Sequence, residues 1–239
     1  MGLVIAAVIT AAGSSSRMGG VKKEYRPLGK ELRSDGKPIT VLDSAVRAFR
    51  AVPRVGLIVI TVPLQEEQGE TAAREALDPL FLGPTGHPPI LFVPGGNSRR
   101  SSVHHALTLL RAYEPDFVLI HDGARPWIRP PLIDRTIDAA IQFRAVIPGL
   151  PQVETPKEID PSGQVVRHLK RAAVISAQTP QGFAFPEILR AHEQAGEEEI
   201  TLGREFTDDA EVWGSFMGPV MVIPGEAENR KITFPEDLP

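Results

Sequence analysis

The chain has 239 residues, of which 42% are hydrophobic and 23% charged, and its formal net charge is -4. This composition suits a globular chain with a substantial core and excludes a disordered one. The mildly acidic balance argues against a general nucleic-acid-binding protein, which would carry a basic face. The absence of cysteine excludes disulfides, thiolate catalysis and cysteine-ligated metal centres.

The start of the chain does not read as a targeting segment. Residues 1–13 are apolar but lack a basic beginning and run into a loop, so we expect a strand there rather than a signal peptide. No apolar run reaches the length that spans a membrane. We therefore expect a cytoplasmic protein that binds neither nucleic acid nor membrane.

Apolar, β-branched runs alternate along the chain with segments of helical character. We expect strands at Leu3–Ile9, Gly56–Val62, Ile90–Val93, Phe117–Ile120, Ala145–Ile147 and Val220–Ile223. We expect helices at Val41–Ala51, Gln65–Leu77, Ser101–Ala112 and Pro131–Phe143. Continuous apolar runs suit strands that are buried on both faces. The alternation therefore predicts an α/β fold with a doubly wound, mostly parallel sheet.

Residues 148–181 break this alternation. Two short strand-like runs, 153–160 and 164–170, flank Pro161-Ser162-Gly163, which predicts a β-hairpin that leaves the main sheet. A lone hairpin is only marginally stable, so we expect it to pack on something, such as a second subunit. We interpret residues 1–239 as one domain with this arm, residues 148–178, inserted in it. The acidic stretch 193–206 reads as a solvated loop.

The loop after the first strand is the first candidate site, because ligands of open α/β sheets bind beyond the carboxyl ends of the strands. It contains Ala11-Ala12-Gly13-Ser14-Ser15, followed by Arg17 and Lys23. Small residues let backbone N–H groups approach an anion, and the two cations suit phosphate oxygens. The pattern is neither a Walker loop nor a dinucleotide fingerprint. We favour a phosphate-binding loop over an ordinary loop with solvated cations.

Two later strand ends carry further candidates. Gly95-Gly96 and the serines at 98, 101 and 102 follow the third strand, where a helix start would bind an anion or simply be capped by serine. Asp122 follows the fourth strand, between His121 and Arg125. This acid would hold a magnesium ion or a hydroxyl, or it would form an Asp–Arg ion pair that fixes a turn. His121 itself is typical of a packed, hydrogen-bonded histidine.

The motifs occur in an order that identifies a family. They are AAGSSSRMG, KKEY, GGNSRRSSV, HDGARP, VETPK, KR, AQTPQGF, TDDA and NRKITFPEDL, and they run from Val8 to Leu238. In this order the chain resembles the 2-C-methyl-D-erythritol 4-phosphate cytidylyltransferases, polyol-phosphate cytidylyltransferases of the non-mevalonate isoprenoid pathway. The resemblance implies a Rossmann-like nucleotidyltransferase that transfers CMP from CTP to the polyol phosphate and releases pyrophosphate. It also implies a magnesium ion and a homodimer formed through the arm.

The resemblance assigns roles to particular residues. The catalytic positions are Arg17, Lys23, Asp122 and Lys231, with Asp122 also beside the metal. The nucleotide-binding positions are Ala11, Ala12, Gly13, Ser14, Ser15, Gly96, Asn97 and Ser102. The positions around the substrates are Arg125, Thr155, Arg171, Thr179 and Thr207, of which Thr155 and Arg171 would come from the partner subunit.

Four of these motifs depart from the family's usual pattern. Lys22-Lys23-Glu24-Tyr25 stands for Pro-Lys-Gln-Tyr, Glu154 for Asp, Asn97 for Asp and Arg230 for Ile. Two alternatives therefore stay open: a transferase for ribitol 5-phosphate, and a non-catalytic nucleotide-binding protein that kept the fold.

Overall fold

The computed structural model describes residues 2–13, 22–64, 69–84 and 87–239. Its strands are β1 (Ile5–Thr10), β2 (Pro27–Leu32), β3 (Pro38–Thr40), β4 (Val55–Val62), β5 (Ile90–Pro94), β6 (Phe117–Asp122), β7 (Ala145–Pro151), β8 (Lys157–Ile159), β9 (Val165–His168), β10 (Ile175–Ala177), β11 (Gln181–Ala184) and β12 (Met221–Pro224). Its α-helices are α1 (Val41–Arg50), α2 (Gly69–Ala76), α3 (Pro79–Leu82), α4 (Arg99–Leu110), α5 (Pro130–Phe143), α6 (Glu187–Leu202) and α7 (Asp209–Phe216).

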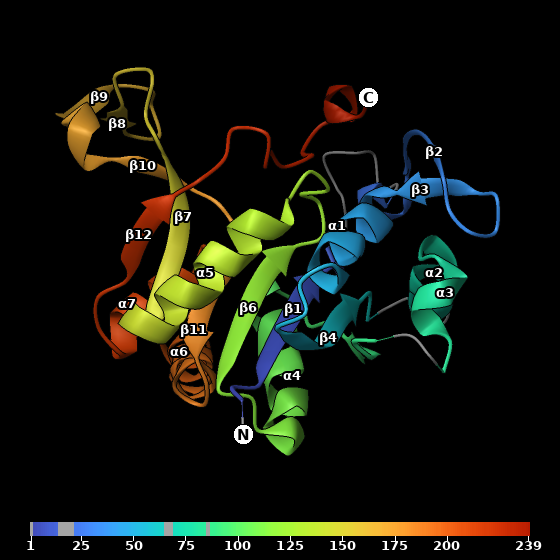
Figure 1. Ribbon diagram of the computed structural model, residues 1–239. Coiled ribbons are helices and arrows are strands. Elements are labelled where there is room, and N and C mark those ends of the chain that lie inside the picture. Colours follow the sequence, from blue (N-terminus) through green and yellow to red (C-terminus); the bar gives the residue numbers. More distant parts are fainter. Residues whose placement is uncertain (1, 14–21, 65–68, 85–86) are drawn as a thin grey trace.

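The central sheet has the strand order β10-β7-β11-β6-β1-β4-β5, and β12 also pairs with β7 (Figure 1). β1 is parallel to β4 and β6, β4 to β5, and β12 to β7. This arrangement confirms the predicted mostly parallel sheet. β11 runs antiparallel between β6 and β7, and it was not predicted, because its four residues, QGFA, are too few to show a period.

Helices cover both faces of the sheet. α1 contacts α5, whereas α4 contacts α6 and α6 contacts α7, and Figure 1 shows these two sets on either side of the strands. The residues Ala6 to Ile9 of β1 are fully buried between them. A strand covered on both faces needs apolar side chains at every position, which is why β1 reads as a continuous apolar run. Among the described residues, none of the helices combines the length and the apolar composition that crossing a bilayer would require.

The predicted strands and helices all occur, with shifted ends. The helix predicted at Ser101–Ala112 is α4, which begins two residues earlier because Ser98 caps it. The Ser98 hydroxyl accepts from Ser101 N, and the Ser101 hydroxyl accepts from Ser98 N in return. The helix predicted at Gln65–Leu77 is α2, and residues 65–68 lie outside the described residues.

The acidic stretch 193–206 is largely helical, so its interpretation as a loop was wrong. α6 continues through it to Leu202, and Gly203 ends the helix in the left-handed region at φ 64°. Glutamate is a good helix former, and the charges that suggested a solvated loop are partly paired. Glu199 binds Arg100 at 2.7 Å and Glu198 binds Arg204 at 2.9 Å.

The segment 157–168 forms a two-stranded antiparallel hairpin of β8 and β9, apart from the main sheet (Figure 1). Its turn lies at the expected Pro161-Ser162-Gly163. The Asp160 carboxylate accepts from Ser162 N and Gln164 N, both at 2.9 Å, and Gly163 adopts φ 86°. All residues of β8 and β9 are exposed.

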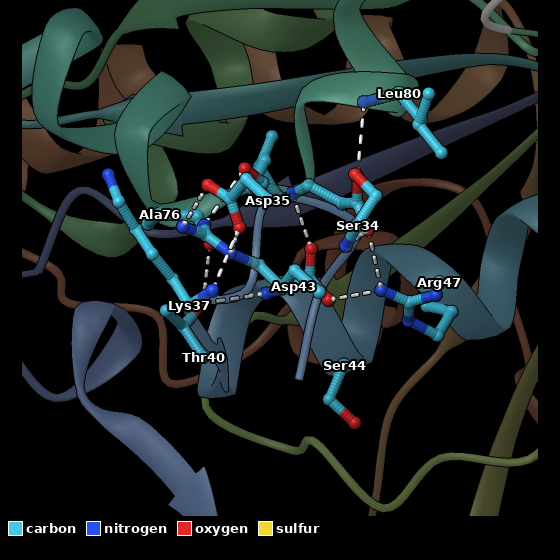
Figure 2. Close-up of polar contacts among 12 residues, drawn as sticks. Ser34, Asp35, Lys37, Thr40, Asp43, Ser44, Arg47, Ala76 and Leu80 are labelled. Atoms are coloured by element: carbon cyan, nitrogen blue, oxygen red, sulfur yellow. Dashed lines mark hydrogen bonds and ion pairs between the residues drawn. The ribbon is translucent and has the colours of Figure 1, made fainter. Parts of the chain in front are cut away.

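A buried polar cluster attaches the small β2–β3 sheet to α1 (Figure 2). Asp43 of α1 is fully buried, and its carboxylate accepts from Asp78 N at 2.6 Å and from Arg47 Nη2 at 3.0 Å. Asp78, just before α3, accepts from Ser34 N at 2.9 Å and from Arg47 at 3.3 Å. Arg33 donates to the carbonyls of Glu75 and Leu77, at the C-terminal end of α2. These bonds connect residues 33–47 to residues 75–78, which are distant from them in sequence.

Burial and hydrogen bonding act in opposite directions on the two acids of this cluster. Burial raises the pKa of Asp43, and the bonds from Asp78 N and Arg47 only partly oppose that effect. Burial also disfavours ionised Asp78, but donors from Ser34, Leu80 and Arg47 prevail and lower the pKa of Asp78 to about 2. Asp78 is therefore ionised at neutral pH and pairs with Arg47.

Removing the Asp43 carboxylate should destabilise the fold. Asp43→Ala leaves the buried Asp78 N without its acceptor and removes one of the two carboxylates that pair with Arg47, and we expect it to lower the free energy of unfolding by about 1–3 kcal/mol. Asp138→Ala is the matched control, because Asp138 pairs with Arg54 at 2.6 Å on an exposed face and should cost less than about 1 kcal/mol. Urea denaturation measures both values. Equal losses in the two variants would contradict the role given to the cluster.

Candidate functional site

The candidate site centres on the Asp122 carboxylate at the end of β6. Asp122 is buried, with 6% of its surface exposed, and three cationic side chains surround it. Lys231 Nζ lies 2.9 Å from Oδ2, Arg125 Nε 3.4 Å from Oδ2, and Arg99 Nε 3.4 Å from Oδ1. Both carboxylate oxygens are thus engaged by cations from different parts of the chain.

These cations keep Asp122 ionised. Burial alone would raise the pKa of this carboxyl, but the charges of Lys231, Arg99 and Arg125 outweigh that effect and hold the pKa far below its usual range. The Asp–Arg ion pair that the sequence left open is therefore present, as one of three pairs. The set carries more positive than negative charge, so it is suited to anionic ligands.

Lys231 reaches Asp122 because the segment after β12 folds back over the turn that follows β6. Ile232 N donates to Ala124 O at 2.8 Å, and Arg125 Nη1 donates to Asn229 O at 2.8 Å. The buried Asn229 in turn donates through Nδ2 to Thr179 O at 2.8 Å. These backbone contacts place the lysine at the carboxyl ends of the strands although it lies more than a hundred residues from β6 in the sequence.

Lys23 also lies at this end of the sheet. Its Nζ donates to the carbonyl of Ile232 at 2.9 Å, directly beside Lys231 in the chain. Lys22, which was not predicted, donates through Nζ to Ala11 O at 3.2 Å and to Gly13 O. Lys22, which stands where the family usually has proline, therefore contacts the backbone of the predicted nucleotide-binding loop.

The predicted nucleotide-binding positions on two loops lie together. Gly96 N donates to the Ser102 hydroxyl at 3.0 Å. A Cβ at Gly95 would collide with the side chain of Ala12, so glycine there lets the loop after β5 pack against the loop after β1. Ala11 is buried and its N donates to Thr61 O at 3.2 Å, whereas Gly13 and Asn97 are exposed. Ser14, Ser15 and Arg17 lie outside the described residues.

Thr179 and His121 together fix the backbone of Asp122. His121 Nε2 lies 3.2 Å from Arg125 O, which can only accept, so Nε2 carries the proton of the neutral ring. Nδ1 is then an acceptor, and the Thr179 hydroxyl donates to it at 3.0 Å while accepting from Asp122 N at 3.1 Å. The fully buried His121 is the packed histidine that the sequence predicted. The Thr179 hydroxyl is occupied within the protein.

Three of the predicted substrate residues are not brought to Asp122 within the described part of the chain. Thr155 and Arg171 are exposed and lie with the hairpin, where Arg171 Nη1 donates to Val153 O at 3.0 Å. Thr207 precedes α7, and its hydroxyl donates to Glu211 at 2.8 Å. Asp208 caps that helix by accepting from Glu211 N at 2.8 Å.

Arg99 is a site residue that was missed from the sequence. Besides Asp122, the last residue of β6, it contacts Asp209, the first residue of α7, at 2.8 Å. Its position two residues before the predicted start of a helix was the one available signal. The N-terminus of α7, through Asp209, thereby becomes a neighbour of the site.

A magnesium ion at this site would need phosphate and water ligands besides Asp122. Within the described ranges no three histidine or acidic side chains gather as a complete metal site. Mg²⁺ commonly binds through one or two carboxylates together with phosphates and water, and Asp122 offers one ionised carboxylate. The cations on both of its oxygens make it a poor resident site for a metal without the phosphates.

The buried His121 predicts a pH dependence of stability. Burial lowers the pKa of His121 from 6.5 to about 4. Between pH 6.5 and 4 the imidazole of His121 binds a proton in the unfolded chain but stays neutral in the folded chain. The contribution of neutral His121 to the free energy of unfolding is therefore complete above pH 6.5 and is lost as the pH falls to 4. The loss amounts to about 3 kcal/mol. Denaturation curves between pH 7 and 4 measure this loss of stability. His121→Gln should flatten the dependence of the free energy of unfolding on pH. His105→Gln, at an exposed site, is the control and should not flatten it. An unchanged dependence in His121→Gln would contradict this account.

Comparison with protein families agrees with this geometry. The model of the IspD family, 2-C-methyl-D-erythritol 4-phosphate cytidylyltransferase, matches residues 5–239. The chain is 35% identical over 238 residues to the bifunctional enzyme IspD/IspF of Bartonella henselae and 38% identical over 236 residues to that of Nitrobacter winogradskyi. Each match covers 98% of the chain but 55% and 54% of the relative, so the chain spans about half the length of these curated relatives.

Solved structures show the same fold. The 4-diphosphocytidyl-2C-methyl-D-erythritol synthase of Anaerococcus prevotii superposes with a TM-score of 0.76 at 29% identity, covering 98% of this chain and 92% of that one. The 2-C-methyl-D-erythritol 4-phosphate cytidylyltransferase of Thermus thermophilus gives 0.67 at 28% identity, covering 96% and 93%. With the family match over nearly its whole length, the chain belongs to the 2-C-methyl-D-erythritol 4-phosphate cytidylyltransferase (IspD) family.

Proposed function

We propose that the chain transfers CMP from CTP to 2-C-methyl-D-erythritol 4-phosphate and releases pyrophosphate. The observation that carries this proposal is the excess of cations around one ionised acid at the carboxyl end of the sheet. Lys231, Arg125 and Arg99 surround Asp122, and Lys23 lies beside Lys231. Such a site suits a reaction between two phosphate-bearing substrates, and the family's name specifies which ones. A cytoplasmic location, where CTP is available, is part of this proposal.

The chemistry needs no general base. The attacking group is an oxygen of a phosphate monoester, whose second pKa is about 6, so it is mostly dianionic at pH 7. His121 does not serve as a base in this scheme, since both of its nitrogens are occupied within the protein. What the residues must do is hold two anions in line and offset their charge.

Electrostatic stabilisation is therefore the main task of the side chains. Two like charges about 4 Å apart repel by about 4 kcal/mol at an effective dielectric constant of 20. We assign Arg17 and Lys23 to the triphosphate and to the charge that develops at its α-phosphorus, and Lys231 to the phosphate of the acceptor. Ala11 to Ser15, with Gly96, Asn97 and Ser102, would surround the nucleoside and the phosphates. Arg125 and Thr207 remain candidates for contact with the acceptor.

Asp122 would hold a magnesium ion together with phosphate oxygens of CTP. When bound, the ion would neutralise charge on the triphosphate. The hydroxyl of Thr179 supports this role, because it accepts from Asp122 N and fixes the backbone from which the carboxylate extends. We accordingly assign Thr179 to positioning Asp122 rather than to direct contact with substrate.

A second copy of the chain would complete the site. Several apolar side chains of the arm and its neighbours are exposed, among them Val153 at 80%, Ile159 at 61% and Val166 at 58%. Ile175 of β10 and Val222 of β12 are exposed as well, and both flank Gly149. An exposed apolar surface of this kind suits a protein interface. A homodimer would cover it and carry Thr155 and Arg171 to the partner's Asp122 region.

The two alternatives differ from this proposal in measurable ways. A ribitol 5-phosphate transferase would use the same cations, with the acceptor selected by the hairpin surface that includes Glu154. A non-catalytic protein would bind CTP without turnover. Arg230, which departs from the family pattern, stacks on the Trp127 ring at 4.1 Å and therefore has a structural role that leaves Lys231 in place.

Pyrophosphate release tests the function. With magnesium, we expect release from CTP and 2-C-methyl-D-erythritol 4-phosphate, and little from ATP, GTP or UTP. Lys231→Gln should lower kcat by about 10²-fold or more, since it removes a charge that stabilises the transition state. Release with ribitol 5-phosphate instead would move the enzyme to the other acceptor. CTP binding without release from any pair would support the non-catalytic alternative.

Mixed dimers test the shared site. Arg171→Ala and Lys231→Gln should each inactivate a homodimer, but unfolding and refolding the two variants together should restore about a quarter of the wild-type rate. Half of the dimers are then mixed, and each mixed dimer has one site in which both side chains are intact. No recovery, while sedimentation shows that mixed dimers form, would place Arg171 in the site of its own chain.

A further inference from the structure

The two consecutive arginines at the start of α4, Arg99 and Arg100, each form an ion pair with an acid of another helix. Arg100 is buried and binds Glu199 at 2.7 Å and His192 O at 3.0 Å, so it joins α4 to α6. Arg99 binds Asp209 at 2.8 Å, so it joins α4 to α7, but it also contacts Asp122 at 3.4 Å. Only the first arginine of this pair touches the centre of the candidate site.

We propose that Arg99, held by Asp209, is a positioning residue that orients the Asp122 carboxylate for the transfer reaction. The proposal rests on the function proposed above. Nothing in the family's motif pattern assigned a role to Arg99, and it follows from the ion pairs that surround Asp122.

The two carboxylate oxygens of Asp122 are contacted by different cations. Lys231 and Arg125 both contact Oδ2, whereas Oδ1 is contacted by Arg99. Without Arg99, the two remaining cations would attract either oxygen, and rotation about the side chain would no longer be restrained from the Oδ1 side. Arg99 thus determines which oxygen of Asp122 faces Lys231 and Arg125.

Arg99 is held in place by its ion pair with Asp209. Asp209, with 1% of its side chain exposed, offers Oδ2 to Arg99 while its Oδ1 lies 3.2 Å from Nε2 of the fully buried His192. Burial would favour the protonated acid, but the charge of Arg99 and the contact with His192 lower the pKa of Asp209. An ionised, buried Asp209 therefore holds Nη2 of the planar guanidinium, while the neighbouring Nε reaches Asp122.

This arrangement makes Arg99 unlike a substrate-binding arginine. Its guanidinium lies between two carboxylates, and Asp209 offsets its charge. A residue that acts through Asp122 should affect the chemical step more than the affinity for CTP. The lysine variant should not substitute, because an ammonium cannot span both carboxylates as the fork does.

The test compares Arg99→Ala with Arg100→Ala in the pyrophosphate assay. We expect Arg99→Ala to lower kcat by about 10- to 100-fold, the range known for residues that orient a metal-binding group. The KM for CTP should change little, because Arg99 would not contribute to the binding of CTP in the ground state. Arg100→Ala should keep kcat although it lowers the melting temperature, because Arg100 contributes to packing and does not contact Asp122.

Chemical rescue separates positioning from a general structural defect. Guanidinium ion, added at concentrations below those that affect the melting temperature, should bind between the two carboxylates and raise the kcat of Arg99→Ala at least severalfold. It should not affect Arg100→Ala. Asp209→Asn should also lower kcat, and combining it with Arg99→Ala should add no further loss, because Asp209 would act through Arg99.

The outcomes are distinct. A lower kcat with guanidinium rescue and no further loss in the double variant would support the inference. A higher KM for CTP with unchanged kcat would overturn it and make Arg99 a nucleotide-binding residue. Equal losses in the Arg99 and Arg100 variants without rescue would also overturn it, in favour of a structural role. An inactive wild type would overturn the proposed function itself, whereas an active wild type with an equally active Arg99→Ala would overturn the positioning role alone.

Discussion

The ionised carboxylate of Asp122 is the constraint on which the arrangement of this site depends. A buried charge is costly unless it is paired, and here the pairing is supplied by Lys231, Arg125 and Arg99. Each cation belongs to a different segment: the chain after β12, the turn after β6, and the start of α4. Satisfying one carboxylate therefore requires the start of α4 and the chain after β12, both remote from Asp122 in sequence, to meet at the end of one strand.

The same arrangement explains why the site is suited to phosphate chemistry. The cations are fixed before any substrate arrives, by contacts such as those between Arg99 and Asp209 and between Lys23 and the carbonyl of Ile232. Fixed charges need no reorganisation when negative charge develops during a reaction, so they stabilise a transition state more effectively than mobile ones. The proposed reaction needs this kind of stabilisation and no proton transfer from a side chain.

Much of the fold could be predicted from the sequence, because the buried parallel strands show continuous apolar runs. β11 could not, since four residues carry no period, and the second half of α6 was misread because its glutamates are partly paired with Arg100 and Arg204. In the site, Asp122 and Lys231 were predicted from the family's motifs. The pairing of Arg99 with Asp209 was not, because it depends on how α4 and α7 pack, which no local pattern records. The position of the Thr179 hydroxyl between His121 and Asp122 could not be predicted either, because it depends on tertiary packing.

Amide hydrogen exchange in Asp122→Asn tests most directly whether one carboxylate holds these segments together. The amide nitrogen of Ile232 donates to Ala124 O, and that of Gly96 donates to the Ser102 hydroxyl of α4, so both report on segments that the cations anchor. The account predicts that the substitution markedly accelerates exchange in residues 226–233 and at the start of α4, while β1 and β4 stay protected. Unchanged protection of these segments in the variant would contradict the central role given to Asp122.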